Sequence, residues 1–300
     1  MGGAGATMSE GRGDDMPTIF DRIRAARSKL TRSEKQAADF LVRNYPVVGL
    51  ERITDFATAA KVSSATIQRL VGKLKLSGYP ELRRLLTEEL IETRQGPLTL
   101  GRRINPDEQG DLMRVNLVDA LTRSIEGLPH DELSTIASVL SDRKVHVWLL
   151  GGAFTTPLAE HLDFHLRKLR PGVTLLPHDL TRRTDHMLNV RKGDTLVVFD
   201  VRRYQPDIAE TAKFVASRGG RVILFTDEWM SDIAKIAKHV VSCRVDVGTP
   251  WDSLVALMAA VELLGASLDT ILWKKRGDRL EILENFREMA FVPTWRDHDD

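Results

Sequence analysis

Cysteine is almost absent from this sequence of 300 residues: Cys243 is the only one, so no disulfide can form within the chain. Cys243 ends the apolar run 240–243, which favours a place in a core over a role as a nucleophile. Long apolar stretches are also lacking. The longest, residues 254–268, is interrupted by Glu262 and is too short to span a bilayer, so it predicts a buried helix. No signal peptide is recognisable, and we therefore expect a cytoplasmic protein with no membrane partner.

A strong net charge is missing as well, because 43 Lys and Arg residues nearly balance 42 Asp and Glu residues. The distribution is uneven, however. Residues 17–94 hold 15 basic and 9 acidic side chains, a net charge of +6, which leaves the remainder near −5. The length suggests two domains of ordinary size. A basic module attached to an acidic one fits a reader of nucleic acid joined to a second domain.

The stretch 62–79, VSSATIQRLVGKLKLSGY, has the periodicity of an amphipathic helix. Ser63 is placed to cap its start, and Gly78 is expected just past its end. Its apolar stripe consists of Ile67, Leu70, Val71 and Leu74. A shorter apolar stripe precedes it, made of Ile53, Phe56, Ala57 and Ala60. Only Lys61 and Val62 separate the two segments, which indicates a helix-turn-helix, with a plain helical hairpin as the alternative.

The face opposite the stripe combines small and hydrogen-bonding side chains. Ala65 and Gly72 would let a groove wall approach, and Gln68 and Arg69 have the forked donors that read adenine and guanine edges. A merely solvated surface helix is the other interpretation. The candidate DNA contacts are Ser63, Ser64, Ala65, Thr66, Gln68, Arg69, Lys73 and Tyr79.

The run 62–86 resembles the helix-turn-helix of the RpiR family of bacterial transcription regulators. Upstream, residues 30–45, LTRSEKQAADFLVRNY, are similar to the opening segment of that family. The family pattern is matched at Val62, Ser63, Ala65, Thr66, Arg69, Lys73, Leu74, Gly78, Tyr79, Glu81 and Leu82. This resemblance, over residues 17–94, implies a regulator that binds a double-stranded DNA operator as a homodimer or homotetramer.

Along the chain, the pattern predicts an all-α domain followed by an α/β domain. Five helices are expected within 17–94, with a capping box at Thr31 and Glu34. The expected divisions are a disordered tail at 1–16, the helix-turn-helix domain at 17–94, a linker at 95–111, the second domain at 112–290 and a tail at 291–300.

In the second domain, short apolar β-rich runs alternate with helical segments, which predicts a five-stranded parallel sheet flanked by helices. The strands are expected at 145–150, 173–176, 195–199, 221–225 and 239–243. The helices are expected at 112–126, 131–140, 155–170, 206–218, 231–237, 251–273 and 278–289.

Ligands of an open parallel sheet bind beyond the carboxyl ends of its strands, and three loops qualify. Residues 151–156, GGAFTT, precede a helix and suit an anion. Residues 200–205, DVRRYQ, carry two arginines that form either an anion clamp or a solvated loop or subunit contact, and 226–228, TDE, suit hydroxyl groups. The candidate effector residues are Gly151, Gly152, Thr155, Thr156, Asp200, Arg202, Arg203 and Thr226.

Residues 112–290 resemble the SIS (sugar isomerase) domain that RpiR regulators carry, by order of elements more than by motif. Gly151, Ala159 and Glu160 fit the family's G-x-G-x-S-x-x-x-A-E opening, whereas Ala153 replaces its second glycine. The segment 200–203, DVRR, stands where the family usually has a Ser-x-Ser-Gly phosphate loop. The resemblance implies a sugar-like effector, and the arginines favour an anionic one.

No catalytic or cofactor motif is recognisable. His161 and His165 have metal-compatible spacing, but no third ligand is evident, so we expect no metal site and no cofactor. The function predicted is therefore a regulator and not an enzyme. Two alternatives stay open: a sugar-phosphate isomerase or lyase with an appended DNA-binding-like domain, and a scaffold whose SIS pocket is vestigial.

Overall fold

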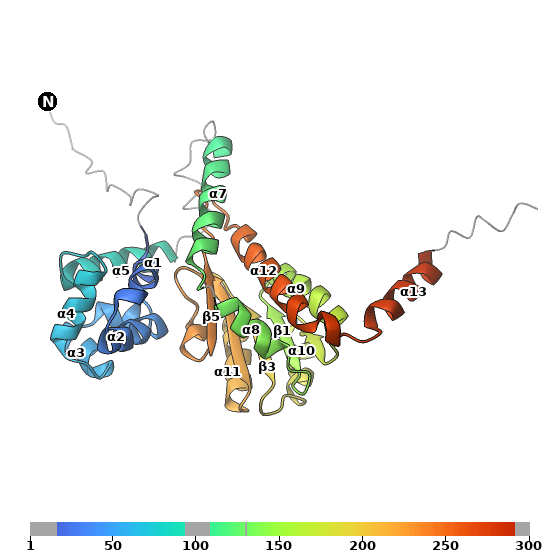
Figure 1. Ribbon diagram of the computed structural model, residues 1–300. Coiled ribbons are helices and arrows are strands. Elements are labelled where there is room, and N and C mark those ends of the chain that lie inside the picture. Colours follow the sequence, from blue (N-terminus) through green and yellow to red (C-terminus); the bar gives the residue numbers. More distant parts are fainter. Residues whose placement is uncertain (1–16, 94–108, 130, 292–300) are drawn as a thin grey trace, which may run out of the picture. The chain divides into compact units, whose positions relative to one another are not determined.

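The computed structural model describes residues 17–93, 109–129 and 131–291 (Figure 1). Its described residues form two compact units. The first contains the residues up to Asn116 together with Val247–Trp251, and the second contains Leu117–Asp246 and the residues from Asp252 onward. The predicted tails and most of the predicted linker lie outside the described residues. Helix α7 begins at Gln109, within the predicted linker, and helix α13 ends at Phe291, within the predicted tail.

The first unit is helical, as the sequence predicted. Its α-helices are α1 (Ile19–Ala26), α2 (Arg32–Arg43), α3 (Ile53–Ala59), α4 (Ser64–Lys73) and α5 (Tyr79–Thr93). Two short 3-10 helices, η1 (Arg27–Lys29) and η2 (Val47–Leu50), lie between them. The expected capping box is confirmed, because the Thr31 side chain accepts from the Glu34 N–H while the Glu34 carboxylate accepts from the Thr31 N–H. Buried apolar side chains from α1 to α5 form the core of this unit.

The turn between α3 and α4 is tight and left-handed. Lys61 has φ 55°, so it occupies a conformation that usually selects glycine, and Ser63 caps α4 through a bond from the Thr66 N–H. The prediction that Gly78 lies just past the end of α4 was wrong. The helix stops at Lys73, and Lys75 supplies the next positive φ, at 60°. The chain leaves the helix at this residue, and the next one, Leu76, is buried at 7% exposure.

The second unit contains the predicted parallel sheet, with strand order β2-β1-β3-β4-β5. The strands are β1 (Val147–Gly151), β2 (Val173–Leu175), β3 (Thr195–Phe199), β4 (Arg221–Asp227) and β5 (His239–Cys243). The helices are α7 (Gln109–Gly127), which crosses the boundary between the units, α8 (Glu132–Leu140), α9 (Thr156–Leu169), α10 (Leu180–Met187), α11 (Pro206–Ser217), α12 (Val255–Leu272) and α13 (Arg279–Phe291). Two 3-10 helices, η3 (Asp232–Lys235) and η4 (Trp273–Lys275), complete the set. The strand order reverses between β1 and β3, which marks the carboxyl ends of these two strands as the expected ligand position.

Both faces of the sheet are covered, which explains the continuously apolar strands. One core cluster joins α8, α9 and α12 to alternate residues of the strands, such as Leu149 and Val197. The opposite face carries buried Leu150 and Val198, and α11 contacts β3 and β4. Cys243 is buried within the core cluster, as predicted.

Two local predictions differ from the structure. The helix expected at 231–237 is the short 3-10 helix η3, and α10 was not predicted at all. The sequence of α10, LTRRTDHM, has almost no apolar residues. It is held instead by the Asp179 cap and by buried Arg183, whose guanidinium donates to Thr211 Oγ1, to the His178 carbonyl and to Asp207.

Helix α12 is longer than the apolar run that predicted it. By length and composition alone, Val255–Lys275 would suffice to cross a membrane. Its inward side chains, from Ala256 to Leu272, pack in the core cluster, which confirms the prediction of a buried helix.

Candidate functional site

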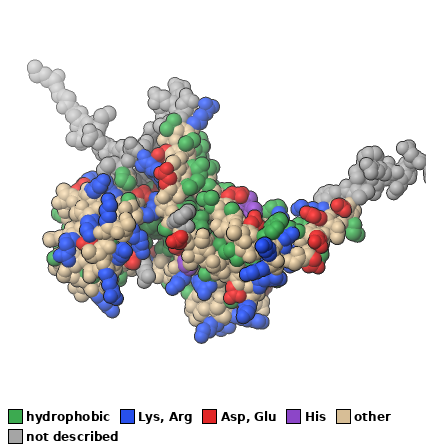
Figure 2. Space-filling view, viewed as in Figure 1, with side chains coloured by type: hydrophobic (Ala, Val, Ile, Leu, Met, Phe, Trp, Pro, Cys, Tyr) green, Lys and Arg blue, Asp and Glu red, His purple; other side chains and the backbone are tan. Residues whose placement is uncertain are grey.

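Helix α4 presents one buried and one exposed face. Ile67, Leu70 and Val71 are at most 1% exposed and fix the helix in the core. Ala65, Gln68, Arg69 and Gly72 are exposed on the other side. A Cβ atom added to Gly72 would meet nothing within 4 Å, so the surface beside it is open. Figure 2 shows Lys and Arg side chains on the visible face of this unit, whose sequence region carries a net charge of +6. The exposed face of α4 can therefore approach a polyanion closely.

The first turn of α4 positions Arg69. The Ser63 and Thr66 hydroxyl oxygens are 3.0 Å apart, and Thr66 is only 4% exposed. Arg69 Nη2 donates to Thr66 Oγ1 at 3.1 Å, while the Arg69 side chain stays 62% exposed. The buried hydroxyl of Thr66, one of the candidate contacts, thus orients the Arg69 guanidinium. Ser64 is partly exposed on the same turn.

Lys73 is engaged within the protein. Its Nζ lies 2.6 Å from Glu34 Oε2 on α2 and donates to the Lys29 carbonyl at 2.8 Å. The Glu34 carboxylate is 2% exposed, and Arg69 Nε lies 3.8 Å from its other oxygen. Burial raises the pKa of Glu34, but the hydrogen bonds from Lys73 and Thr31 outweigh it and lower the pKa overall. The ion pair between Lys73 and Glu34 therefore joins α4 to α2.

Tyr79 also has an internal partner. Its hydroxyl donates to the Glu51 carbonyl at 3.1 Å, so it connects the start of α5 to the segment before α3. Burial, together with the nearby carboxylates of Glu51 and Asp55, raises the pKa of Tyr79 to about 12 although Arg83 opposes the shift. Its hydroxyl therefore stays protonated at neutral pH.

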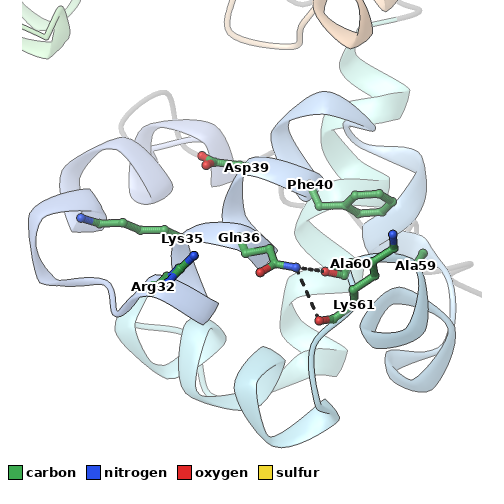
Figure 3. Close-up of a pocket in the computed structure, with 8 residues that line it drawn as sticks. All are labelled: Arg32, Lys35, Gln36, Asp39, Phe40, Ala59, Ala60 and Lys61. Carbon is green, nitrogen blue, oxygen red and sulfur yellow. Dashed lines mark hydrogen bonds between the residues drawn. The ribbon is translucent and has the colours of Figure 1, made fainter.

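A cavity of about 700 Å³ lies between α2 and the end of α3 (Figure 3). Gln36 reaches across it and donates to the Ala60 carbonyl at 2.9 Å and to the Lys61 carbonyl at 3.5 Å. This amide holds the left-handed turn against α2. The cavity is lined by Arg32, Lys35, Gln36, Asp39, Phe40, Ala59, Ala60 and Lys61.

Internal hydrogen bonds hold the loop after β1 in a compact turn. Gly151 packs so closely on α9 that an added Cβ would lie 2.5 Å from the Thr156 Cα. The Gly152 N–H donates to Thr155 Oγ1 at 2.8 Å, and the Thr155 hydroxyl donates in turn to the Phe199 carbonyl at 2.7 Å. Thr156 caps the same turn by donating to the Gly152 carbonyl at 2.8 Å. The two predicted hydroxyls therefore shape the loop.

Gln205, which the sequence did not single out, occupies the space in front of this loop. Its Oε1 accepts from the Ala153 N–H at 2.6 Å, and an added Cβ on Gly152 would lie 2.2 Å from the same oxygen. The Gln205 amide oxygen therefore fills the space beside Gly152 and occupies the Ala153 N–H.

Acidic groups are buried at the ends of β3 and β4. Asp200 is 3% exposed and accepts from Ser231 Oγ, and Thr226 Oγ1 donates to the Asp200 carbonyl at 2.7 Å. Burial raises the pKa of Asp200 to about 7, although the Ser231 hydrogen bond opposes the shift. Asp227 accepts from the Tyr204 hydroxyl at 2.7 Å, and burial raises its pKa to about 6. Burial also raises the pKa of Glu228 well above its usual range.

The two arginines of the loop after β3 have different surroundings. Arg202 is 5% exposed, pairs with Asp252 and lies over the Trp229 ring at 4.5 Å. Arg203 is exposed and has φ 65°. Asp252 was not predicted as a partner of Arg202, because it lies 50 residues further along the chain.

The fold defines a class of protein: a helix-turn-helix domain followed by an α/β domain with a five-stranded parallel sheet. Comparison with known families gives the same division. Residues 18–93 match the model described as "Helix-turn-helix domain, rpiR family", and residues 139–267 match the SIS domain. The chain belongs to the RpiR family.

Solved structures of similar fold include two transcription factors. An RpiR transcription factor from Sphaerobacter thermophilus (sugar isomerase domain) has 23% identity and a TM-score of 0.54, covering 59% of this chain and 99% of that one. The Vibrio vulnificus NanR protein complexed with ManNAc-6P has 16% identity and a TM-score of 0.52, covering 92% of this chain and 100% of that one.

Two curated relatives differ in how much of their own length the match covers. The "Bifunctional protein glk" of Burkholderia thailandensis is 24% identical over 73% of this chain, but the match spans only 34% of that protein. An uncharacterised HTH-type transcriptional regulator of Clostridium perfringens is 19% identical over 74% of this chain and 80% of its own length. This chain thus spans about a third of the length of the first of these relatives.

Proposed function

We propose that the protein is a transcription regulator that binds an operator in double-stranded DNA through α4. The observation that carries this proposal is the exposed face of a helix held rigidly by its cap and core contacts. Gln68 and Arg69 offer forked donors there, and the small residues Ala65 and Gly72 permit entry into the major groove. Two linked copies would present two such helices, so we propose a homodimer or homotetramer in the cytoplasm.

Substitution of Arg69 tests this assignment. Arg69→Ala should weaken specific operator binding by about 1–3 kcal/mol, the range for one good base contact. Folding should be unaffected, because the side chain is 62% exposed. Arg84→Ala is a matched control, since Arg84 is 57% exposed and belongs to α5. The assay is a gel-shift titration on operator fragments and on random duplex. Equal affinity of wild type and Arg69→Ala for the operator would remove Arg69 from base readout.

We propose further that the SIS domain binds an anionic sugar-like effector at the carboxyl ends of β1 and β3. We place the anion beside the loop glycines and the start of α9, where a helix N-terminus favours negative charge. The Thr155 and Thr156 hydroxyls hold this loop in shape through their bonds with Gly152. Because Asp252 holds Arg202, we assign the ligand's charge to the exposed guanidinium of Arg203. Thr226 donates to the Asp200 carbonyl and so fixes the start of the loop after β3. The NanR complex supports a sugar phosphate as the first class to test.

A thermal-shift screen of sugar phosphates and sugar acids tests the effector site, because a ligand that binds only the folded state raises the melting temperature. Arg203→Ala should reduce the shift. Gln205→Ala should enlarge it, since the amide oxygen no longer occupies the Ala153 N–H. An equal rise in melting temperature in the wild type and both variants would contradict the proposed position of the effector. If no anion stabilises the protein, the vestigial scaffold becomes the better explanation.

We propose that the SIS domain acts without catalysis, although isomerases share its fold. Asp200 and Asp227 are at most 3% exposed and are hydrogen-bonded within the chain, so they are poorly placed as an acid–base pair for a substrate. Turnover of a sugar phosphate, followed by NMR and abolished by Asp200→Asn, would favour the isomerase alternative.

A further inference from the structure

The structure places a third potential metal ligand, which the sequence spacing did not reveal, beside the histidine pair. His161 and His165 lie one turn apart on α9, and Glu262 reaches them from α12. The His161 Nε2 atom is 2.6 Å from Glu262 Oε1 and 3.3 Å from His165 Nε2, and His165 Nε2 is 4.0 Å from Glu262 Oε2. The ligand atoms of these three side chains, from two helices, therefore all lie within 4.8 Å of one another.

Their spacing suits a tetrahedral metal ion. Zinc–nitrogen bonds of about 2.0–2.1 Å place two tetrahedral ligand atoms roughly 3.3–3.4 Å apart. The two Nε2 atoms already have this separation, at 3.3 Å. The carboxylate lies nearer one histidine than the other, and a small rotation of its exposed side chain would centre it. Two imidazoles and one carboxylate are a ligand set that zinc accepts with a fourth, open position.

The helices that carry these ligands are rigid without a metal. Leu162 and Leu166 of α9 and Leu264 of α12 belong to the same buried core cluster. Gly265 of α12 lies against the His165 ring, where an added Cβ would be 3.7 Å from Nδ1. The ligand side chains themselves are 31%, 26% and 55% exposed, for His161, His165 and Glu262 respectively, so an ion can enter from solvent.

We propose that His161, His165 and Glu262 bind a zinc ion or a similar divalent transition metal, with water as the fourth ligand. The ion would fasten α9 to α12 at the surface of the second unit. Because α9 begins at the loop that follows β1, the metal would also stabilise the helix whose N-terminus faces that loop. The inference does not depend on DNA binding or on the identity of an effector.

Zinc titration of the full-length, untagged protein tests this proposal. Isothermal calorimetry and elemental analysis after dialysis should show one zinc ion per chain. His161→Ala and Glu262→Gln should each weaken zinc binding by more than about tenfold, because even outer-shell changes cost 10–100-fold. Cobalt, added in place of zinc, should give the absorption of a tetrahedral site.

His239→Gln is the matched control. His239 Nδ1 lies 2.9 Å from Glu132 Oε1, and this pair does not belong to a cluster of three ligands among the described residues. The control should bind zinc as tightly as wild type. Absence of stoichiometric zinc from the wild type, or equal affinity in all variants, would overturn the proposal.

Discussion

Lys73 provides the sharpest test of how the helix-turn-helix is held together. The family resemblance assigns it to DNA, whereas the structure pairs it with Glu34, a carboxylate that is only 2% exposed. A hydrogen bond to a charged group contributes about 1.5–3 kcal/mol, and breaking a fully buried ion pair costs about 3–5 kcal/mol. Lys73 is 35% exposed, so solvent screening reduces the larger figure. We expect Lys73→Ala to lower the free energy of unfolding of this domain by about 1.5–3 kcal/mol.

The pH dependence has a definite sign. Because the pKa of Glu34 is lowered below 4.5 in the folded protein, the stability that this carboxylate contributes is present above that pH and is lost as the pH falls through the folded pKa. The difference between wild type and Lys73→Ala should therefore be largest at neutral pH and should shrink in acid.

Urea unfolding followed by circular dichroism measures the effect in the full chain. Residues 17–93 contain no tryptophan, so the unfolding of α1 to α5 is followed by circular dichroism and not by tryptophan fluorescence. Combining Lys73→Ala with Glu34→Gln in a double-mutant cycle isolates the pair. Lys35→Ala, an exposed change on α2, is the control. Unchanged stability combined with weaker binding to every DNA sequence would refute the structural role and favour a contact from Lys73 to the DNA backbone.

Three further predictions concern single positions. Gly72→Ala should stabilise the domain by about 0.5–1 kcal/mol, because the added Cβ meets no neighbour, but it should weaken operator binding. Gly110→Ala is the control: its Cβ also meets no neighbour, and it should leave DNA affinity unchanged in a gel shift. Lys61→Gly should raise the melting temperature, since a non-glycine residue at φ 55° is strained by about 1 kcal/mol; a decrease would contradict this. The raised pKa of Asp200, about 7 against 3.8, should make stability fall as the pH rises from about 4 to about 7, by at most roughly 4 kcal/mol in urea titrations. Asp200→Asn should flatten that slope, and an identical slope would exclude this carboxyl.

Periodicity was enough to predict most of the fold. The 3.6-residue stripe of Ile67, Leu70 and Val71 identified α4, and Ser63 and Thr31 were correctly recognised as caps because a side-chain acceptor at a helix start acts locally. Helix α10 was missed for the opposite reason. It depends on Arg183, whose partners on α11 are 24 and 28 residues away in sequence.

The candidate sites show the same limit. Exposure of Gln68 and Arg69 follows from the position of the stripe, so the sequence correctly indicated which face of α4 is exposed. Lys73 and Arg202 lie on the predicted elements, but Glu34 and Asp252 engage them from 39 and 50 residues away. Spacing along one helix found the two histidines of α9, whereas Glu262 comes from a helix 101 residues from His161. Long-range partners of charged side chains have no periodic signature.

In the proposed effector site, Gln205 would compete with the ligand for the loop after β1. Its tethered amide holds the Ala153 N–H at 2.6 Å, so an incoming anion would bind only the fraction of molecules in which that contact is open. The observed dissociation constant is then the intrinsic one divided by the open fraction, and a loop that is open about 1% of the time would weaken apparent affinity about a hundredfold. One side chain can thereby set the concentration at which the regulator responds, without altering any group that touches the ligand. Variation at residue 205 would retune that threshold independently of specificity.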